Sequence, residues 1–321
     1  MGAFIKHRRL GAFLGLAAAS LLCSCASVPA ADGPKLAITI DDIPVHGPMP
    51  AGMTAMDVNR EMIAALKAGG VPGVSAYING TWTERDPQTM AAVQAWQQAG
   101  MQLGNHTWSH LNLNDLSVED YKKEIVRNEP LLAKVADGED WHWFRYPFLA
   151  EGDDPAKRTA IRQFLKERGY KIAGVTMSFS DWQFTAAYAR CKDSGNAAAI
   201  GEMEALYLQA VRDNLEYSRG LTTKVYGEQI PLVLLMHVGA MSAHMMPKVI
   251  EIYRSAGYRF VSIAEAQAHS AYAEDVDPAL PPRSGSLESL PAAKGIHLPS
   301  PADNQARLDA MCPGGTTKTF P

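Results

Sequence analysis

The chain has 321 residues, of which 47% are hydrophobic and 20% are charged, and its formal net charge is -4. This length and apolar content are sufficient for a substantial buried core, either in two domains or in a single α/β barrel. Beyond the first 30 residues the sequence contains no basic block suited to phosphate backbones, which argues against nucleic acid as a partner.

The first 30 residues have the order of a secretory signal. Basic residues at 6–9 precede an apolar segment at 10–22, which is too short to span a membrane permanently, and small residues follow up to Ala30. Two processing routes are open, ordinary cleavage after Ala30 or lipid attachment at Cys25. We favour the second because Leu22-Cys23-Ser24-Cys25 resembles a bacterial lipobox. Both routes predict an exported bacterial protein, periplasmic or anchored as a lipoprotein, with a mature net charge of about -7.

Two cysteines, Cys191 and Cys312, remain in the exported chain. In an oxidising compartment they are expected to form a disulfide that ties the C-terminal tail to the body of the protein. Two unpaired thiols are the alternative, which exported proteins seldom keep.

Strands and helices are predicted to alternate after the signal. In chain order the pattern predicts a strand ending at Asp42, a helix at 54–68, a strand at 74–78, a helix at 86–100, a strand at 101–103, a helix from Ser117, a strand at 141–146, a helix from Asp153, a strand at 170–177, a helix at 197–217, a strand at 230–237, a helix at 246–256, a strand at 258–263 and a short helix from Ala264.

The predicted strands are apolar throughout, which is typical of parallel strands covered on both faces. About seven strand–helix repeats predict a distorted or incomplete TIM-like (β/α) barrel, with an open doubly wound sheet as the alternative. We expect this α/β domain at 35–272. A Pro/Ser/Gly-rich C-terminal tail without a core of its own is expected at 273–321.

Two motifs place metal-binding side chains at the ends of predicted strands. Asp41 and Asp42 end the first strand, where two adjacent carboxylates indicate a positive group nearby. His106 and His110 follow the third strand, and their spacing of four would bring both imidazoles to one face of a helical turn. Together they offer an Asp-His-His set with one carboxylate to spare, which predicts a metallohydrolase. A solvated turn and a chance histidine pair are the structural alternatives.

Four more residues lie at predicted strand ends, where α/β folds collect their ligands. Arg145 follows the fourth strand, Asp181 and Trp182 follow the fifth, and His237 ends the sixth. Taken singly, Arg145 could be a surface ion-pair residue and His237 a core histidine. Asp181 and Trp182 could belong to an ordinary turn. Their joint placement favours a single site.

The order of these motifs resembles the polysaccharide deacetylases of carbohydrate esterase family four, the NodB-type deacetylases. Five segments between about Leu36 and Ala268 carry the resemblance: Thr39-Ile40-Asp41-Asp42-Ile43, His106-Thr107-Trp108-Ser109-His110, Arg145-Tyr146-Pro147-Phe148, Ser180-Asp181-Trp182 and Leu235-Met236-His237. The resemblance implies a distorted (β/α) barrel and a divalent metal. It also implies hydrolysis of N-acetyl or O-acetyl groups on a glycan substrate, a polysaccharide of the cell envelope or the extracellular space.

The resemblance implies two roles for the first motifs. The metal, with Zn²⁺ preferred over Co²⁺, Ni²⁺ or Mn²⁺, would be held by Asp42, His106 and His110. Asp41 would be the general base that takes a proton from water, and Arg145 would hold it in place.

The remaining motifs would supply the acid and the substrate contacts. His237 would be the general acid, with Asp181 setting its protonation. Phe148 would offer its backbone N–H to the oxyanion, and Tyr146 and Trp182 would line the substrate site.

Three positions depart from the family pattern. Ile43 replaces a glycine beside the carboxylates, and Val238 stands where an acidic residue is often found. Ser178 stands near the place of an aspartate, which predicts a looser network around the arginine or the acid.

Two other functions remain open. Two histidines and one carboxylate also form the facial triad of non-haem Fe(II) oxygenases, although that function leaves Asp41, Arg145 and His237 without roles. The second alternative is a catalytically inactive glycan-binding envelope protein that keeps the metal site.

Overall fold

The computed structural model describes residues 1–2, 33–278, 295–296 and 301–313. Apart from its first two residues, the predicted signal, with Cys25, lies outside the described residues, as does much of the predicted tail. Within the described ranges, no helix is both long and apolar enough to cross a membrane.

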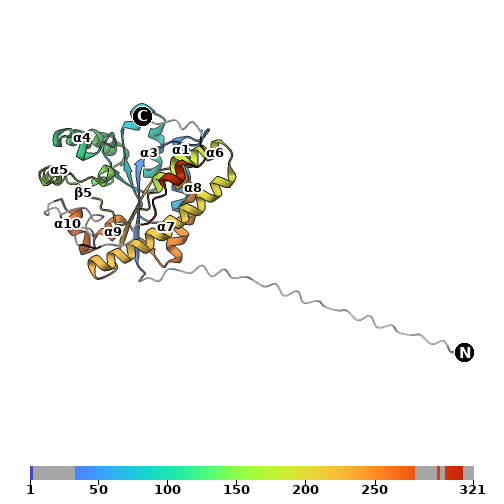
Figure 1. Ribbon diagram of the computed structural model, residues 1–321. Coiled ribbons are helices and arrows are strands. Elements are labelled where there is room, and N and C mark those ends of the chain that lie inside the picture. The colour runs from blue at the N-terminus through green and yellow to red at the C-terminus, as the bar shows by residue number, and fades with distance from the viewer. Residues whose placement is uncertain (3–32, 279–294, 297–300, 314–321) are drawn as a thin grey trace.

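A sheet of seven parallel strands forms the centre of the protein (Figure 1). The strands are Lys35–Ile43 (β1), Ser75–Ile78 (β2), Gln102–Asn105 (β3), Trp143–Phe144 (β4), Lys171–Ile172 (β5), Leu232–His237 (β6) and Arg259–Phe260 (β7). Their order is β5-β4-β3-β2-β1-β6, and β7 pairs with the start of β1. Beyond β5, Met177 bridges Leu234 of β6, so the sheet curls back toward itself. This incomplete (β/α) barrel confirms the predicted fold class.

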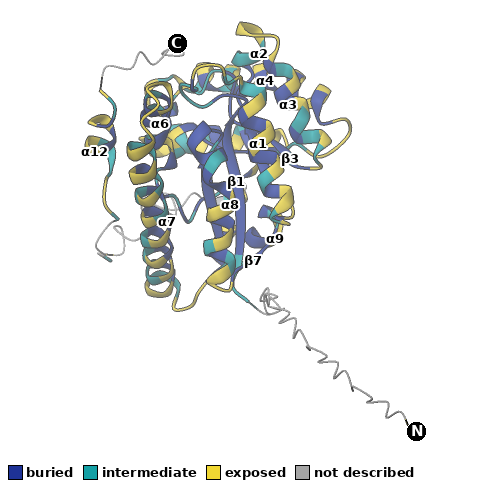
Figure 2. Ribbon diagram, turned by 90° about the vertical axis from the view of Figure 1, so that its right-hand side faces the viewer, coloured by how far each residue is buried: buried dark blue, intermediate teal, exposed yellow. Residues whose placement is uncertain are grey.

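Helices surround the sheet, and Figure 2 shows buried strands behind helices whose outer faces are exposed. They are Ala55–Ala68 (α1), Thr81–Arg85 (α2), Thr89–Gln98 (α3), Val118–Val135 (α4), Pro155–Glu167 (α5), Phe184–Asp193 (α6), Ala197–Tyr226 (α7), Ala240–Ser255 (α8), Ile263–Gln267 (α9), Ala273–Val276 (α10) and Gln305–Asp309 (α12). Short 3₁₀ helices occur at Leu113–Asp115 (η1), Pro147–Leu149 (η2), Asp181–Gln183 (η3) and Ser270–Tyr272 (η4).

Capping side chains fix several helix starts that the sequence predicts. Thr54 and Asp57 form a reciprocal capping box at the start of α1, and Ser117 caps α4. Asp154 caps α5, which has a proline in its first turn, where the missing N–H costs nothing. These side chains satisfy backbone N–H groups that have no partner inside the helix.

Several element bounds differ from the sequence prediction. Helix α6 was not predicted, α7 continues to Tyr226, and α8 begins at Ala240 despite Pro247 inside it. The buried face of α8 outweighs the cost of its proline. The strand predicted at 170–177 is divided, because only Lys171–Ile172 pairs with β4 and the following residues cross to β6. Such long-range pairing has no local sequence signal.

The C-terminal segment is attached to α6. Cys191 and Cys312 form a disulfide, as predicted from the sequence. The Arg190 guanidinium donates to the backbone carbonyls of Leu308 and Met311 at 3.0 and 3.1 Å, and the Leu308 side chain is fully buried. Helix α12 therefore packs beside α6 (Figure 2). Two short helices, α10 and α12, thus lie within the range predicted to form a tail.

Removing this disulfide should destabilise the protein. The bond joins residues 121 positions apart, so it removes many conformations from the unfolded chain. We expect Cys312→Ser to lower the free energy of unfolding by about 2–5 kcal/mol in urea titrations followed by circular dichroism. The Cys191→Ser/Cys312→Ser double variant should match the single variant. An unchanged unfolding midpoint would show that the crosslink contributes nothing.

Candidate active site

A pocket of about 490 Å³ opens where β1, β3 and β6 end. Its walls are Asp41, Asp42, His46, His106, His110, Tyr146, Phe148, Leu149, Ser178, Ser180, Trp182, Leu235 and His237. The structure thus brings eight of the ten residues singled out from the sequence into one cavity. The other two, Arg145 and Asp181, are fully buried and contact wall residues.

The backbone around the pocket is strained. Six of its residues that are not glycine have φ between 53° and 65°: Asp42, Thr107, His110, Phe148, Leu149 and Ser180. Side chains with a Cβ rarely adopt this left-handed conformation, which costs about 1–3 kcal/mol at each position. Such strain persists where the surrounding structure enforces it, and it clusters at functional sites.

Asp41 is paired with a buried guanidinium. Arg145 Nη1 lies 3.2 Å from Asp41 Oδ2, and both side chains are almost completely buried. Arg145 also donates from Nη2 to the Thr39 hydroxyl at 3.2 Å and from Nε to the Ala173 carbonyl at 2.9 Å. This is the positive group that the adjacent carboxylates of β1 require. Besides Asp41, Thr39 and the Ala173 carbonyl accept hydrogen bonds from Arg145.

The Arg145 guanidinium also lies on the ring of Tyr77, 4.8 Å from its centre. Gly104 of β3 makes room for that ring, since a Cβ there would lie 2.6 Å from Tyr77 Cδ1. The Arg145 carbonyl lies 2.8 Å from His106 Nδ1. A carbonyl can only accept, so this nitrogen carries the proton and Nε2 offers its lone pair to the pocket.

Asp42, His106 and His110 form a cluster with metal-ligand chemistry. Asp42 Oδ1 lies 3.4 Å from His106 Nε2 and 3.3 Å from His110 Nε2. This oxygen is buried and has no hydrogen-bond partner among the described residues. A buried carboxylate oxygen without a donor, facing two imidazole nitrogens, fits a divalent cation.

The predicted helical turn at His106 and His110 was wrong. The segment is an irregular loop with positive φ at Thr107 and His110. The two rings nevertheless lie 4.8 Å apart, because the loop folds back after β3. The spacing of four therefore identified the pair for an incorrect reason.

Charge and burial set the protonation of this cluster. Burial alone would raise the pKa of Asp42, but His110, His106 and His46 hold that pKa well below its usual range. Burial lowers the pKa of His110 to about 4, although the Asp42 charge opposes this. An ionised carboxylate and a neutral imidazole are the forms that bind metal ions.

A second buried pair faces the cluster across the pocket. His237 Nδ1 lies 2.8 Å from Asp181 Oδ1, and the His237 backbone N–H donates to Asp181 Oδ2 at 2.8 Å. Ser242 also donates to this carboxylate, at 2.7 Å. Burial would lower the pKa of His237, but the charge and hydrogen bond of Asp181 raise it to about 9. His237 is therefore an imidazolium at neutral pH.

Aromatic side chains form the rim and one wall of the pocket. Phe148 and Trp182 expose 63% and 45% of their surface, which is unusual for large apolar residues. The Phe148 ring lies 4.6 Å from that of His110. Tyr146 is buried, and its hydroxyl has no hydrogen-bond partner in the described part of the chain. Exposed rings at the mouth of this pocket suit a ligand with apolar faces.

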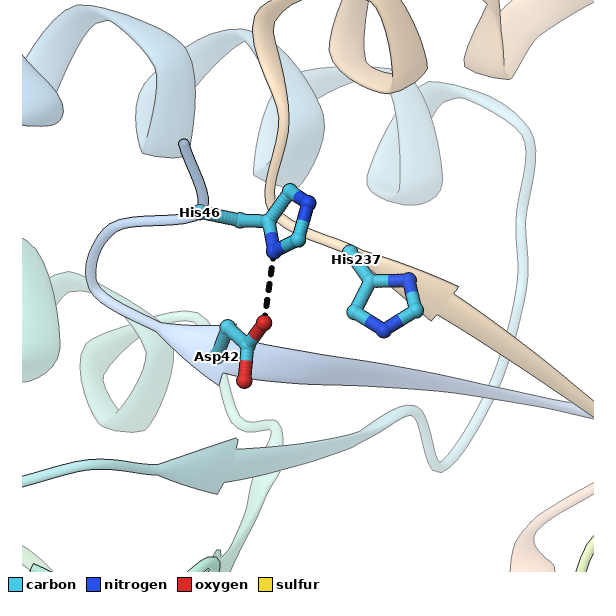
Figure 3. Close-up of side chains that lie close together, drawn as sticks. All are labelled: Asp42, His46 and His237. Atoms are coloured by element: carbon cyan, nitrogen blue, oxygen red, sulfur yellow. Dashed lines mark hydrogen bonds and ion pairs between the residues drawn. The ribbon is translucent and has the colours of Figure 1, made fainter. Parts of the chain in front are cut away.

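His46 lines the pocket and has a titratable side chain that could bind a metal, and the sequence interpretation missed it. It lies in the loop after β1, and its Nδ1 is 2.6 Å from Asp42 Oδ2 (Figure 3). One signal was available, because His46 follows Asp42 by the same spacing of four as His110 follows His106.

Comparison with protein families gives a match over residues 29–173, to the family model described as polysaccharide deacetylase. Over this range the chain is similar to the family. The matched range contains the Asp41–Asp42, His106–His110 and Arg145–Phe148 motifs, and it ends before Asp181 and His237. No curated protein matches the sequence at a significant level.

The solved structures that this chain resembles are distant in sequence. The wild-type BA3943 protein of Bacillus anthracis, described as a CE4 (carbohydrate esterase family 4) pseudoenzyme, is 14% identical with a TM-score of 0.52, over 73% of this chain and 66% of that chain. A BA3943 mutant described as having restored enzymatic activity is 15% identical with a TM-score of 0.51, over 73% and 68%. A family 4 carbohydrate esterase from Streptomyces lividans, in complex with acetate, is 19% identical with a TM-score of 0.46, over 73% and 95%.

The protonation of His237 should depend on Asp181. In the metal-free protein we expect the imidazolium to persist until the pH rises to about 9. Asp181→Asn removes the charge but keeps the burial, so the pKa should fall below the ordinary value of about 6.5. Histidine-selective NMR titration, assigned with His237→Gln, measures both values.

The same pair should make stability depend on pH. The folded-state pKa of His237 is raised, so the stabilisation that the pair contributes is complete below about pH 6.5 and is lost as the pH rises through about 9.

Ser242→Ala, which leaves the Asp181 charge in place, should shift the pKa of His237 less than Asp181→Asn. A pKa that does not change in Asp181→Asn would contradict this account.

Proposed function

We propose that the protein is a metal-dependent deacetylase that removes N-acetyl or O-acetyl groups from a polysaccharide of the cell envelope or the extracellular space. One observation carries the proposal. A candidate metal cluster, a carboxylate held by a buried arginine, and an imidazolium held by a buried aspartate surround the same pocket. These are the groups that hydrolysis of an acetyl group requires.

The metal would be held by Asp42, His106 and His110. The unpartnered Asp42 Oδ1 and the inward-facing imidazole nitrogens support this ligand set. A divalent ion, which we propose is Zn²⁺, would supply Lewis-acid polarisation and a more acidic water at this place. The set also fits a facial-triad iron site. Asp41 and His237 line the same pocket, and Arg145 is bound to Asp41. These residues favour the hydrolase, since the oxygenase function leaves them without roles.

Asp41 would accept the proton of the attacking water. Its carboxylate lies beside the cluster, with Oδ2 3.7 Å from His106 Nε2. The nearer partner of Oδ2 is Arg145 Nη1, at 3.2 Å. Arg145 orients the carboxylate. Asp42 makes the closer approaches to both histidines, which supports ligand for Asp42 and base for Asp41.

His237 would donate a proton to the departing amine or alcohol. Its Nδ1 is bound to Asp181, so Nε2 is the nitrogen that can deliver a proton to the pocket. The raised pKa keeps that proton in place at neutral pH. The backbone N–H of Phe148 would stabilise the oxyanion, while Tyr146 and Trp182 would contact the sugar.

The proposed site of action is outside the cytoplasm. The Cys191–Cys312 disulfide supports an oxidising compartment. We propose a catalytic domain at 35–272, preceded by an export signal with a lipid anchor at Cys25 and followed by a C-terminal tail at 273–321.

Two variants should separate metal binding from proton transfer. His110→Ala should lose both zinc and activity, because it removes a ligand. Asp41→Asn should retain zinc and lose turnover by about 10²–10⁴-fold, the usual contribution of a general base. Metal content by mass spectrometry and acetate release from acetylated glycans measure the two effects. Equal zinc loss in both variants would mean that the two aspartates are assigned the wrong way round, and glycan binding without acetate release would favour the inactive alternative.

The role of His237 can be tested through the leaving group. An amine leaves poorly without a proton, so His237→Ala should slow hydrolysis of an N-acetyl sugar by about 10²–10⁴-fold. An activated aryl acetate has a leaving group that departs unaided, so the same variant should lose much less activity on it. Steady-state rates on both substrates give the comparison. Equal losses would assign His237 to the shape of the pocket instead.

A further inference from the structure

His46 contacts both halves of the site without having a role in the reaction described above. Its Nδ1 lies 2.6 Å from Asp42 Oδ2, and its ring centre lies 4.7 Å from that of His237. Figure 3 shows the three side chains, with His46 coming from the loop after β1 and His237 from the end of β6. The His46 side chain is largely buried.

The two oxygens of Asp42 have different neighbours. Oδ1 faces the Nε2 atoms of His106 and His110, while Oδ2 faces His46 Nδ1. Rotation of the Asp42 carboxylate about its bond to Cβ would exchange the two oxygens. It would also change the distance between Oδ1 and the two imidazoles. A donor fixed on Oδ2 prevents this rotation and leaves Oδ1 aimed at the two imidazoles. Ligating carboxylates in metal sites are commonly held by such hydrogen bonds.

The loop that carries His46 is itself fixed from two sides. Asn59 of α1 donates from its side chain to the Pro44 carbonyl at 2.8 Å, and the Ala51 N–H donates to Asp193 of α6 at 2.6 Å. Gly47 has a φ of +66°, and a Cβ there would lie 3.0 Å from Thr185 Cγ2. A larger residue at 47 would therefore be strained and crowded against α6. This packing places the His46 ring instead of leaving it to solvent.

A second metal ion between Asp42, His46 and His237 is the competing explanation, because their ligand atoms lie within 4.8 Å of one another. Two observations oppose it. His46 Nδ1 is already at hydrogen-bond distance from Asp42 Oδ2. The Asp42 oxygen that lacks a partner is Oδ1, on the side of His106 and His110.

We propose that His46 is a positioning residue, which donates from Nδ1 to Asp42 Oδ2 and so sets the affinity of the Asp42-His106-His110 site for a divalent cation. This inference rests on the metal site of the proposed function. His46 lies outside the five sequence motifs, so this role belongs to the loop after β1.

The test is the dissociation constant for Zn²⁺, measured on metal-free protein by competition with a chromophoric chelator. His46→Leu removes the donor at similar size, and we expect it to weaken Zn²⁺ binding by about 10–100-fold. His46→Asn offers a side-chain N–H near the position of Nδ1, and it should recover most of the affinity. The matched control is His244→Ala, since His244 pairs with Glu204 and does not line the pocket, so the affinity should be unchanged.

The outcomes separate this inference from the proposed function. If wild type binds Zn²⁺ and His110→Ala loses it, while His46→Leu binds as tightly as wild type, His46 has no positioning role and the proposed function stands. Equal weakening in His46→Leu and His46→Asn would also overturn the inference, since it would show a packing role. Two Zn²⁺ per wild-type chain, with one lost in His46→Leu, would make His46 a ligand. Absence of Zn²⁺ binding in wild type would overturn the metal site itself.

Discussion

The Arg145 guanidinium is the constraint on which the site depends. Two adjacent carboxylates end β1 inside the protein, and a buried pair of like charges is not stable without a cation. Arg145 supplies that cation from the end of β4, and its carbonyl orients His106 at the end of β3. The same residue contacts Thr39 of β1 and the ring of Tyr77 of β2. One residue, through its side chain and its carbonyl, therefore couples four neighbouring strands to the geometry of the pocket.

Charge is divided across the pocket in a way that suits two proton transfers. On one side, Asp42 is held ionised and His110 is held neutral. In these forms both side chains can donate an electron pair to a metal ion. On the other side, Asp181 holds His237 as a proton donor. The two histidines have opposite protonation because His237 has a buried carboxylate bonded to it and His110 does not. Residue type alone does not separate such roles, whereas the partners of each imidazole do.

Much of the fold was predictable because it depends on local pattern. Apolar strands, capped helix starts and polar residues at strand ends are all visible in the sequence, and so is the cysteine pair. The failures concern features that other parts of the chain impose. The loop conformation at His106–His110 depends on strained backbone, and the bridge from Met177 to Leu234 depends on pairing across 57 residues. His46 was missed because its significance lies in a contact with Asp42, and proline- and glycine-rich loops give no periodic signal.

The halves of the site come from different parts of the chain, so closure of the sheet determines whether they meet. The family match ends at residue 173, before the chain crosses to β6. Asp41 of β1 and His237 of β6 are direct partners in the strand register. A slip of one residue in that pairing would turn His237 to the opposite face of the sheet and leave Asp181 without its partner. The spacing of the proposed base and acid is therefore a property of strand register.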